Sequence, residues 1–295
     1  MTAVDGFEAN RHRLFAVAYR MLGSVAEAEE VVQDAWLRWD RAEQATVENP
    51  AGWLTTVTTR LAIDRLKSAS HRREIYVGPW LPEPVVDRVD ADPAGHVELA
   101  ESLSMAFLTM LERLNPVERA AFLLREVFGS EYGDSASAVD RSEAACRQIV
   151  HRARERVDPD RPARYDADPA DEKRLLDGFL AATFDGDLDA LKLVLHDDVV
   201  AWSDGGADRR AARHPILGAE RVARFMTGIA RRGPDDGAAL GIEPVRVNGD
   251  PGYLVRTDGD VFMTMAFELS ADAEGDVRIG TIRAVLNPRK LDHLR

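Results

Sequence analysis

Two clusters of basic residues are the part of this chain best suited to binding chemistry. They read RLKSASHRR at residues 65–73 and RQIVHRARER at residues 147–156. Lysine and arginine neutralise phosphate groups, so a cluster of them along one helix is typical of a nucleic-acid-binding surface. The whole chain carries a net charge of −13, which makes both clusters basic islands in an acidic protein. The charge pattern therefore indicates two separate contacts with nucleic acid.

Catalytic and metal-binding motifs are absent from the same part of the sequence. Before residue 158 there is no Walker phosphate loop and no HExxH pair. The single cysteine, Cys146, excludes an internal disulfide and a multi-cysteine zinc site. No apolar run reaches the ~18 residues of a membrane span, and the charged N-terminus does not resemble a secretory signal. We therefore expect a cytoplasmic protein that is not an enzyme, has no metal or cofactor and contacts no membrane.

Helical patterns surround the first basic cluster. Ser24 and Glu27 have the spacing of a capping box, and apolar residues then recur at helical intervals as far as Trp39. Asn49 followed by Pro50 predicts the start of a second helix. Its apolar stripe is predicted to be Trp53, Leu54, Val57, Leu61 and Leu66, and its polar side Thr56, Arg60, Asp64 and Lys67.

A helix-turn-helix is predicted around the second basic cluster. Asn115 and Pro116 start a helix with Glu118 at the capping position, and Gly129 is the expected stop. Ser142 is the expected N-cap of a basic last helix. Two short helices joined by a tight turn, the second of them basic, are typical of a motif that reads duplex DNA.

The chain changes its periodicity after residue 157. A stretch rich in proline and aspartate, residues 158–171, marks a linker. Beyond it, amphipathic helices are followed by runs that alternate as strands do. Turns between these strands are predicted at Gly249-Asp250, Asp258-Gly259 and Gly275-Asp276. Helices first and hairpins after them indicate a separate α+β domain.

A rigid apolar segment, VGPWLPEPVVD, lies between the two basic clusters at residues 77–87. Its prolines pre-set the backbone, which lowers the entropy lost when the segment docks on a surface. Trp80 and Leu81 supply apolar area for such a contact. The segment is too rigid for a spacer and too apolar for a solvated tail, so we expect it to dock.

Several blocks of the sequence, taken in order, carry a resemblance to a known family. They are AEAEEVVQDAWLRW, NPAGWLTTVTTRLAIDRLK, LNPVERAAFLLREVFG and AACRQIVHRARERV. Together they resemble regions 2 and 4 of bacterial sigma factors of the extracytoplasmic-function group. WLPEP in the linker, SDGG in the third segment and NPRKL near the C-terminus resemble a subgroup with a SnoaL-like C-terminal extension. The resemblance covers nearly the whole chain.

This resemblance implies a multidomain fold. Two all-α domains, a sigma region 2 helical bundle and a sigma region 4 helix-turn-helix, would precede an α+β SnoaL-like cone-shaped domain. The implied segments are 1–76 for region 2, 77–95 for a linker with the WLPEP motif, 96–157 for region 4, 158–167 for a second linker and 168–295 for the SnoaL-like domain. The implied function is to bind core RNA polymerase and direct promoter recognition and transcription initiation.

Partners and residue roles follow from the same resemblance. The partners would be promoter DNA and the polymerase core, through its largest-subunit clamp helices and its flap. The candidates for binding the core are Glu27, Glu30, Asp34 and Trp36. The candidates for the proximal promoter element, which must be melted, are Thr56, Arg60, Arg65, Lys67, Arg72 and Arg73. The candidates for the distal element are Ser142, Arg147, Gln148, His151, Arg152 and Arg154.

Two positions depart from the family pattern. Relatives often have asparagine where this chain has Arg60, and they usually have an apolar core residue where it has Ser135. The first departure affects the expected base preference. The second is expected to loosen the packing of one helix in the helix-turn-helix without changing its role.

The resemblance further implies that the SnoaL-like domain regulates the sigma factor in cis, with the WLPEP segment docked on it. The residues predicted at this contact are Trp80, Leu81, Pro82, Glu83, Pro84, Asp204, Gly205, Gly206, Asn287, Pro288, Lys290 and Leu291. In an open alternative, the segment passes through the RNA-exit channel of the polymerase without touching the third domain. An unknown small ligand in the third domain is also left open.

Two further functions fit the sequence. A helix-turn-helix transcriptional regulator with a ligand-sensing domain would act independently of the polymerase core. A cyclase-type enzyme fused to a DNA-binding region would use a carboxylate base against a carbon acid. Its only plausible polar lining groups are Asp204, Asp208, His214 and Asp258. We favour a turn interpretation of the SDGGAD segment, since aspartate and glycine favour bends.

Overall fold

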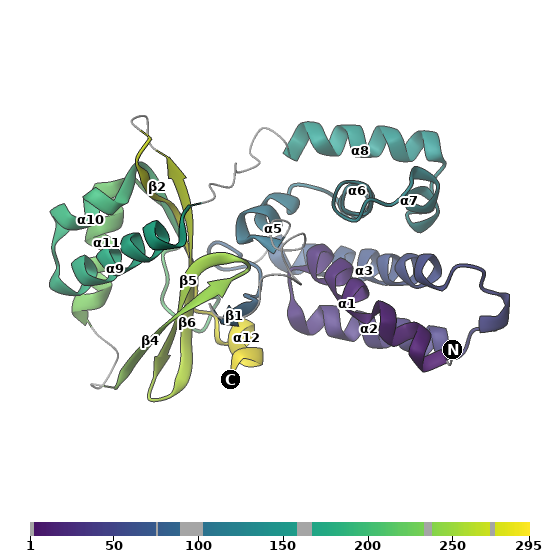
Figure 1. Cartoon of the computed structure of the whole chain (residues 1–295), viewed down its shortest axis with the longest axis horizontal. Coiled ribbons are helices and arrows are strands. Elements are labelled where there is room, and N and C mark those ends of the chain that lie inside the picture. The colour runs from purple at the N-terminus through teal and green to yellow at the C-terminus, as the bar shows by residue number, and fades with distance from the viewer. Residues whose placement is uncertain (1–2, 75, 89–102, 158–166, 233–237, 272–274) are drawn as a thin grey trace. The chain divides into compact units, whose positions relative to one another are not determined.

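The structure is a computed structural model that describes residues 3–74, 76–88, 103–157, 167–232, 238–271 and 275–295 (Figure 1). The chain divides into two compact units. The first unit joins Met1–Ile75 with Ala106–Arg161, and the second joins Tyr76–Met105 with Pro162–Arg295. The WLPEP segment therefore belongs to the same unit as the C-terminal residues. The finer division into five segments stays a prediction.

The first unit is helical. Its N-terminal part contains α1 (Ala3–Leu22), α2 (Val25–Asp40), the 3-10 helix η1 (Gln44–Thr46) and α3 (Pro50–Glu74). Its second part contains α5 (Met105–Leu111), α6 (Pro116–Phe122), the π-helix η4 (Leu123–Val127), α7 (Tyr132–Ala138) and α8 (Glu143–Val157). Met105, the first residue of α5, is grouped with the second unit.

The predicted caps explain where these helices begin. Ser24 Oγ accepts a hydrogen bond of 3.2 Å from the Glu27 amide at the start of α2. Asn49 Oδ1 accepts one of 3.0 Å from the amide at the third position of α3. Asn115 and Glu118 form both halves of a capping box before α6. Each cap satisfies an amide that a helix leaves without an internal partner.

The buried face of α3 differs from the predicted stripe. Leu54 and Leu66 are buried as expected, but Trp53, Val57 and Leu61 are only half-buried. The other buried residues of the helix are Thr55, Thr58, Thr59, Ala62 and Ile63. The helix packs against α1 and α2 and also against α6 and α7, so small side chains fill the positions of close approach. A sequence pattern based on large apolar residues does not predict a buried face that contains several threonines.

The helix-turn-helix is formed by α6 to α8. Gly129 has a φ of 62°, which only glycine adopts without strain, and it follows the last turn of η4. The inner face of α8 consists of Cys146, Ile149, Val150, Ala153 and Val157. Ala145, one position before Cys146, is half-buried. The prediction of two helices with a tight turn is confirmed, with Cys146 as an additional core residue.

The second unit is an α+β domain built on one sheet of seven strands in the order β1-β4-β5-β6-β7-β2-β3. Its strands are β1 (Val86–Arg88), β2 (Leu195–Asp204), β3 (Ile216–Leu217), β4 (Leu240–Val247), β5 (Asp250–Thr257), β6 (Asp260–Ala271) and β7 (Val277–Val285). Its helices are α9 (Pro169–Asp185), α10 (Leu188–Val194), α11 (Ala219–Arg232), α12 (Pro288–Leu291) and the 3-10 helix η7 (Asp292–Leu294). The hairpins at Asn248-Gly249 and Asp258-Gly259 have positive φ at both residues, as tight turns require.

The sheet has an apolar cluster on each face. Helices α9, α10 and α11 cover one face (Figure 1), where Phe179, Val222 and Phe267 are among the buried residues. The other cluster contains strand residues such as Val247 together with Leu81 of the WLPEP segment and Leu291 of α12. The linker therefore supplies part of the core of this domain. It also supplies the edge strand β1, which pairs antiparallel with β4.

Within the described residues, no helix is long and apolar enough to cross a membrane. The longest helices are α1 and α3, and both carry charged residues along their length.

Candidate functional site

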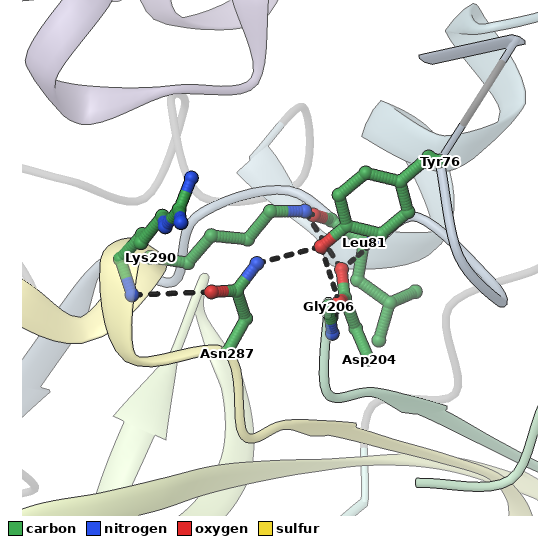
Figure 2. Close-up of polar contacts among 7 residues, drawn as sticks. Tyr76, Leu81, Asp204, Gly206, Asn287 and Lys290 are labelled. Carbon is green, nitrogen blue, oxygen red and sulfur yellow. Dashed lines mark hydrogen bonds and ion pairs between the residues drawn. The ribbon is translucent and has the colours of Figure 1, made fainter. Parts of the chain in front are cut away.

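Asp204 is the centre of a buried polar cluster that holds the linker (Figure 2). It lies at the end of β2. Its Oδ1 accepts hydrogen bonds from Tyr76 Oη at 2.6 Å and from the Gly206 amide at 3.1 Å. Its Oδ2 accepts from the Leu81 amide at 2.8 Å and from Lys290 Nζ at 2.7 Å. The carboxylate thus has four donors, two of which come from the linker, and this compensates for its removal from water.

Lys290 also contacts the linker directly. Its ammonium also donates to the carbonyl oxygen of Leu81, so both peptide groups of that residue are bonded to the C-terminal domain. The Nζ atom lies 4.3 Å from the centre of the Trp80 ring and 4.9 Å from that of Tyr76. These distances are within the range of a cation–π contact, which strengthens when water is excluded.

Asn287 links the start of α12 to the linker. Its Nδ2 donates to Tyr76 Oη at 2.6 Å, and its Oδ1 accepts from the Arg289 amide at 3.1 Å as the cap of the helix. The turn after β2 must pass close to this side chain. A Cβ atom on Gly206, which has a φ of 59°, would lie 2.6 Å from Asn287 Nδ2. One on Gly205 would lie 2.4 Å from the carbonyl oxygen of Arg209. Both glycines are needed for the close approach.

We call the set of Tyr76, Leu81, Asp204, Asn287 and Lys290 the linker clamp. Burial is the main cause that raises the pKa of Tyr76 above its usual value, and the hydrogen bond to Asp204 raises it further. A neutral phenol that donates to a buried carboxylate is consistent with this direction. The phenol of Tyr76 therefore remains protonated well above neutral pH.

The rest of the WLPEP segment continues along the sheet. Pro82 and Pro84 are buried, Glu83 is half-buried, and the carbonyl oxygen of Pro84 lies 2.8 Å from His293 Nε2. Pro288 is the first residue of α12, which positions Lys290 and Leu291. The structure thus brings together the three predicted motifs, WLPEP, SDGG and NPRKL. Their regulatory role stays a prediction.

Two residues of this contact were not found from the sequence. Tyr76 was assigned to the end of region 2, but its hydroxyl bonds to Asp204 and Asn287. Asn248, which is buried, accepts a bond of 3.0 Å from the Val85 amide and donates one of 2.8 Å to the carbonyl oxygen of Leu103. Asparagine before glycine is a turn signal, but it does not reveal which distant backbone the side chain binds.

In the first unit, Arg60 bonds to the helix-turn-helix. Its Nη2 donates to the carbonyl oxygen of Ser137 at 2.7 Å and its Nε to that of Ala138 at 3.3 Å. These carbonyls end α7, where a cation also interacts favourably with the helix dipole. Asp64, one helical turn after Arg60, lies 3.0 Å from Lys67. The proximal-element candidate thus contacts region 4 in this conformation.

The other proximal-element candidates occupy different surroundings. Arg65 Nη1 lies 2.7 Å from Glu30 Oε2, so a residue predicted to bind phosphate pairs with one predicted to bind polymerase. Lys67 is exposed, and Thr56 is half-buried. The side chains of Arg72 and Arg73 lie outside the described residues.

The outer face of α8 presents the distal-element candidates. Ser142 Oγ accepts from the Ala145 amide at 3.3 Å and so caps the helix as predicted. Gln148 and Arg152 are exposed, with no ion pair or side-chain hydrogen bond among the described residues. His151 lies 3.7 Å from Glu155. These side chains share the solvent-facing side of the helix.

Two arginines of α8 have partners within the unit. Arg147 pairs with Glu143, and its guanidinium lies 4.2 Å from the centre of the Tyr132 ring. Arg154 makes a two-pronged contact with Glu126 at 2.7 and 3.0 Å. A phosphate contact by Arg154 would have to compete with this pair, which makes it a weaker candidate than Arg152.

The candidates for polymerase binding lie on α2. Glu30 and Asp34 are exposed, and Glu27 is half-buried beside the cap. Trp36 is half-buried and meets Phe7 edge-on, with ring centres 5.1 Å apart. The helix therefore presents an acidic rim beside an aromatic edge, as the sequence predicts.

Comparison with known proteins identifies the two parts of the first unit. The family model described as Sigma-70 region 2 matches residues 7–72, and the one described as Sigma-70, region 4 matches residues 104–157. ECF RNA polymerase sigma factor SigJ of Mycobacterium tuberculosis is 40% identical over 292 residues, which cover 97% of this chain and 92% of SigJ. This chain belongs to the extracytoplasmic-function family of RNA polymerase sigma factors.

The similarity of this sigma factor to its relatives extends through the C-terminal domain. A probable ECF RNA polymerase sigma factor, SigI of the same species, is 34% identical over 291 residues, with 98% of this chain and 94% of SigI covered. The crystal structure of Mycobacterium tuberculosis SigJ matches with a TM-score of 0.73 at 35% identity and covers 98% of each chain. The predicted fold of two helical sigma regions and a SnoaL-like domain is confirmed. The matches support a sigma factor rather than a regulator that acts without polymerase.

Proposed function

We propose that this sigma factor binds core RNA polymerase, directs it to promoter DNA and is regulated in cis by its SnoaL-like domain. The matches to regions 2 and 4 along the length of SigJ and SigI support the first two parts. The linker clamp supports the third part. It is the observation that carries the proposal, because it fastens the segment that joins the two sigma regions.

The segment Tyr76–Met105, which contains the linker, is bonded to the SnoaL-like domain near both of its ends. Leu81 is held through its amide and carbonyl by Asp204 and Lys290, and Leu103 accepts a hydrogen bond from Asn248. When this segment is fixed at two points, the distance between the sigma regions at its ends varies less than when the segment is free. Docking and undocking of the linker would thus shift the population of conformations that can engage a promoter.

The contact of Arg60 supports a closed resting conformation of the sigma regions. A guanidinium that donates to the carbonyls of Ser137 and Ala138 cannot use the same donors for a base. Promoter binding by α3 then requires these hydrogen bonds to open. Opening becomes favourable when polymerase and DNA supply replacement contacts.

Within this function, α8 would enter the major groove of the distal element. Arg147 and Gln148 lie towards its N-terminal half and are proposed to read bases, while His151, Arg152 and Arg154 are proposed to contact the backbone. On α3, Thr56, Arg60, Arg65, Lys67, Arg72 and Arg73 are proposed to contact the melted proximal element. On α2, the acidic rim and Trp36 are proposed to bind the clamp helices of the core, with region 4 on the flap.

The test is reconstitution with bacterial core polymerase and a promoter library, with binding to core measured beside run-off transcription. We expect the full chain to bind core stoichiometrically and to initiate transcription from a subset of promoters. If docking and polymerase binding compete for the linker, Leu81→Ser and Asp204→Ala should bind core several-fold more tightly than the unchanged chain. Arg289→Ala is the matched control, because this exposed neighbour on α12 is not part of the clamp.

Two results would contradict the proposal. A chain that fails to associate with core polymerase is not acting as a sigma factor. Clamp variants that remain folded by circular dichroism but bind core no more tightly than Arg289→Ala would exclude competition for the linker. The latter result would leave the sigma function itself in place, so the two parts of the proposal fail separately.

A further inference from the structure

The SnoaL-like domain contains a partly open cavity of about 1010 Å³, to which the proposed sigma functions assign no role. It lies between the sheet and the helices α9 and α11, and most of its lining is aromatic or aliphatic, as with Phe179, Phe225 and Met265. Binding sites for small molecules have volumes of roughly 300–1,000 Å³ and apolar walls. The cavity therefore has the size and surface of a ligand site.

Most of the polar groups that the sequence offers to a carbon-acid enzyme lie outside the cavity. Of the four groups singled out from the sequence, only Asp208 is part of the lining. Asp204 is occupied in the linker clamp, and Asp258 accepts a hydrogen bond from the Ala239 amide in a turn. Asp208 is therefore the one carboxylate of this set that lines the cavity, and the enzyme interpretation stays an untested alternative.

Two buried hydroxyl groups in the lining have no hydrogen-bond partner among the described residues. They are Tyr253 Oη and Thr183 Oγ1, on residues that are 4% and 9% exposed. A buried hydroxyl without a partner lowers stability, so its presence in a folded protein needs a reason. A bound molecule with a polar atom would supply the missing partner.

The charged residues of the lining are mostly basic. Arg209, Arg210 and Arg232 contribute to it, against one carboxylate, Asp208, whose Oδ2 lies 3.3 Å from exposed Arg289. The Arg209 guanidinium lies 4.3 Å from the centre of the Phe262 ring, which holds the cation against the cavity wall. A guanidinium placed in this way is suited to a carboxylate or another acidic oxygen group.

Part of the cavity lining is both apolar and exposed. Phe184, Ile229 and Leu240 all contribute to the lining and are among the few large hydrophobic residues that the described chain exposes. They come from α9, α11 and β4, so three separate elements contribute exposed apolar side chains to the same cavity. Exposed apolar groups gathered in this way mark a route for an apolar molecule rather than chance exposure.

We propose that this cavity binds an apolar small molecule that carries one acidic group. The body of the molecule lies among the aromatic and aliphatic side chains, and the acidic group pairs with Arg209. No residue of the lining belongs to the linker clamp, although Ser203, Leu286 and Pro288 adjoin Asp204 and Asn287 along the chain. The proposal concerns binding alone and does not depend on the proposed regulation in cis.

The test uses two fluorescent probes that share one body. 8-Anilinonaphthalene-1-sulfonate has an acidic group, and N-phenyl-1-naphthylamine is the same body without it. Each probe is titrated into the full chain and into Arg209→Gln, with Arg224→Gln as the matched control on the exposed side of α11. Two variants that fill the cavity, Ala230→Trp and Thr257→Trp, test where the probes bind.

We expect the sulfonate probe to bind one site in the unchanged chain. Arg209→Gln should weaken its binding about tenfold, as the loss of one charged hydrogen bond does, and change that of the neutral probe less than twofold. Arg224→Gln should change neither. At least one cavity-filling variant that keeps its circular dichroism spectrum should lose both probes.

Two outcomes would overturn the proposal. If both filled variants fold and still bind the probes as the unchanged chain does, binding occurs outside the cavity. If Arg209→Gln affects both probes equally or neither of them, the site does not select an acidic group. Should one filled variant fail to fold, the other variant and the Arg209→Gln comparison still decide the outcome.

Discussion

The ammonium of Lys290 lies 2.7 Å from Asp204 Oδ2, and the two side chains are 8% and 0% exposed. Both residues belong to the SnoaL-like domain, yet the pair also bonds the amide and the carbonyl of Leu81 in the linker. Two buried charges are costly to remove from water, and attraction between them does not by itself guarantee a net gain. We interpret the pair as a docking site for the linker, because the amide of Leu81 donates to Asp204 and its carbonyl oxygen accepts from Lys290.

Removing one charge of the pair should lower the free energy of unfolding more than removing both charges does. Asp204→Ala leaves the Lys290 ammonium buried without its counter-charge, so we expect the free energy of unfolding of the SnoaL-like domain to fall by about 3–5 kcal/mol. In the double variant Asp204→Ala/Lys290→Met the loss should be smaller than in Asp204→Ala alone. Urea unfolding of the unchanged chain, Asp204→Ala, Lys290→Met and the double variant measures both effects. If the changes in the free energy of unfolding of the two single variants add up to that of the double variant, the two charges act independently.

The docked linker should behave as part of the hydrophobic core. Leu81 is 1% exposed among strand residues of the sheet, so Leu81→Ala should lower the free energy of unfolding by about 2–5 kcal/mol. Val77→Ala, four residues earlier and exposed, is the control and should change it little. Trp80→Ala should in addition alter the tryptophan fluorescence of the folded chain. If Leu81→Ala proves as mild as Val77→Ala, the linker is not docked in solution.

Alkaline pH should loosen the clamp through Tyr76. Burial and the bond to Asp204 raise the pKa of this phenol in the folded state above its usual value of 10.0. The stability that it contributes is fully present below pH 10 and is lost as the pH rises towards the folded-state pKa. Tyr76→Phe removes the hydrogen bonds, so it should be less stable at neutral pH but lose less stability above pH 10. Equal slopes for the two proteins in alkaline urea titrations would argue against this role.

Substitutions at two exposed residues of α8 should distinguish base recognition from phosphate contact. Arg152→Ala should weaken binding to duplex distal elements of every sequence and lower the salt slope by about one. Arg147→Ala should weaken binding by about 1–3 kcal/mol at the preferred sequence and relax the preference itself. Holoenzyme titrations at several salt concentrations measure both. If neither variant changes binding, α8 is not the recognition helix.

Ser135 gives an opportunity to stabilise region 4. It is fully buried in α7, and its hydroxyl has no hydrogen-bond partner among the described residues. Ser135→Ala removes the orphan group at almost no cost in volume, so we expect a gain of about 1 kcal/mol or more in the free energy of unfolding. Ser137→Ala, in the same helix, is the comparison. A loss of stability in Ser135→Ala would mean that the hydroxyl has a partner in solution.

Much of the fold could be predicted because its signals are local. Ser24, Asn49, Asn115 and Ser142 cap the helices that follow them, since a cap depends on residues only three positions apart. The strands of the SnoaL-like domain fall in the predicted part of the chain, and the turn at Asp258-Gly259 is as predicted. The turn predicted at Gly249-Asp250 lies one residue earlier, at Asn248-Gly249. The face of α3 was not predictable in this way, because packing on two sides buries threonines that a pattern of large apolar residues does not include.

The sequence by itself determined the order of the helical regions, the positions of the basic helices and the three short motifs that meet at the linker. Only the tertiary structure decided that Tyr76 and Asn248 take part in that contact, that Arg60 bonds to the end of α7, and that Tyr253 and Thr183, whose hydroxyls are buried, line an apolar cavity. The reason is physical. Capping and periodicity act between near neighbours, whereas a buried charge or hydroxyl finds its partner across the fold, as Asp204 does with a lysine 86 positions away.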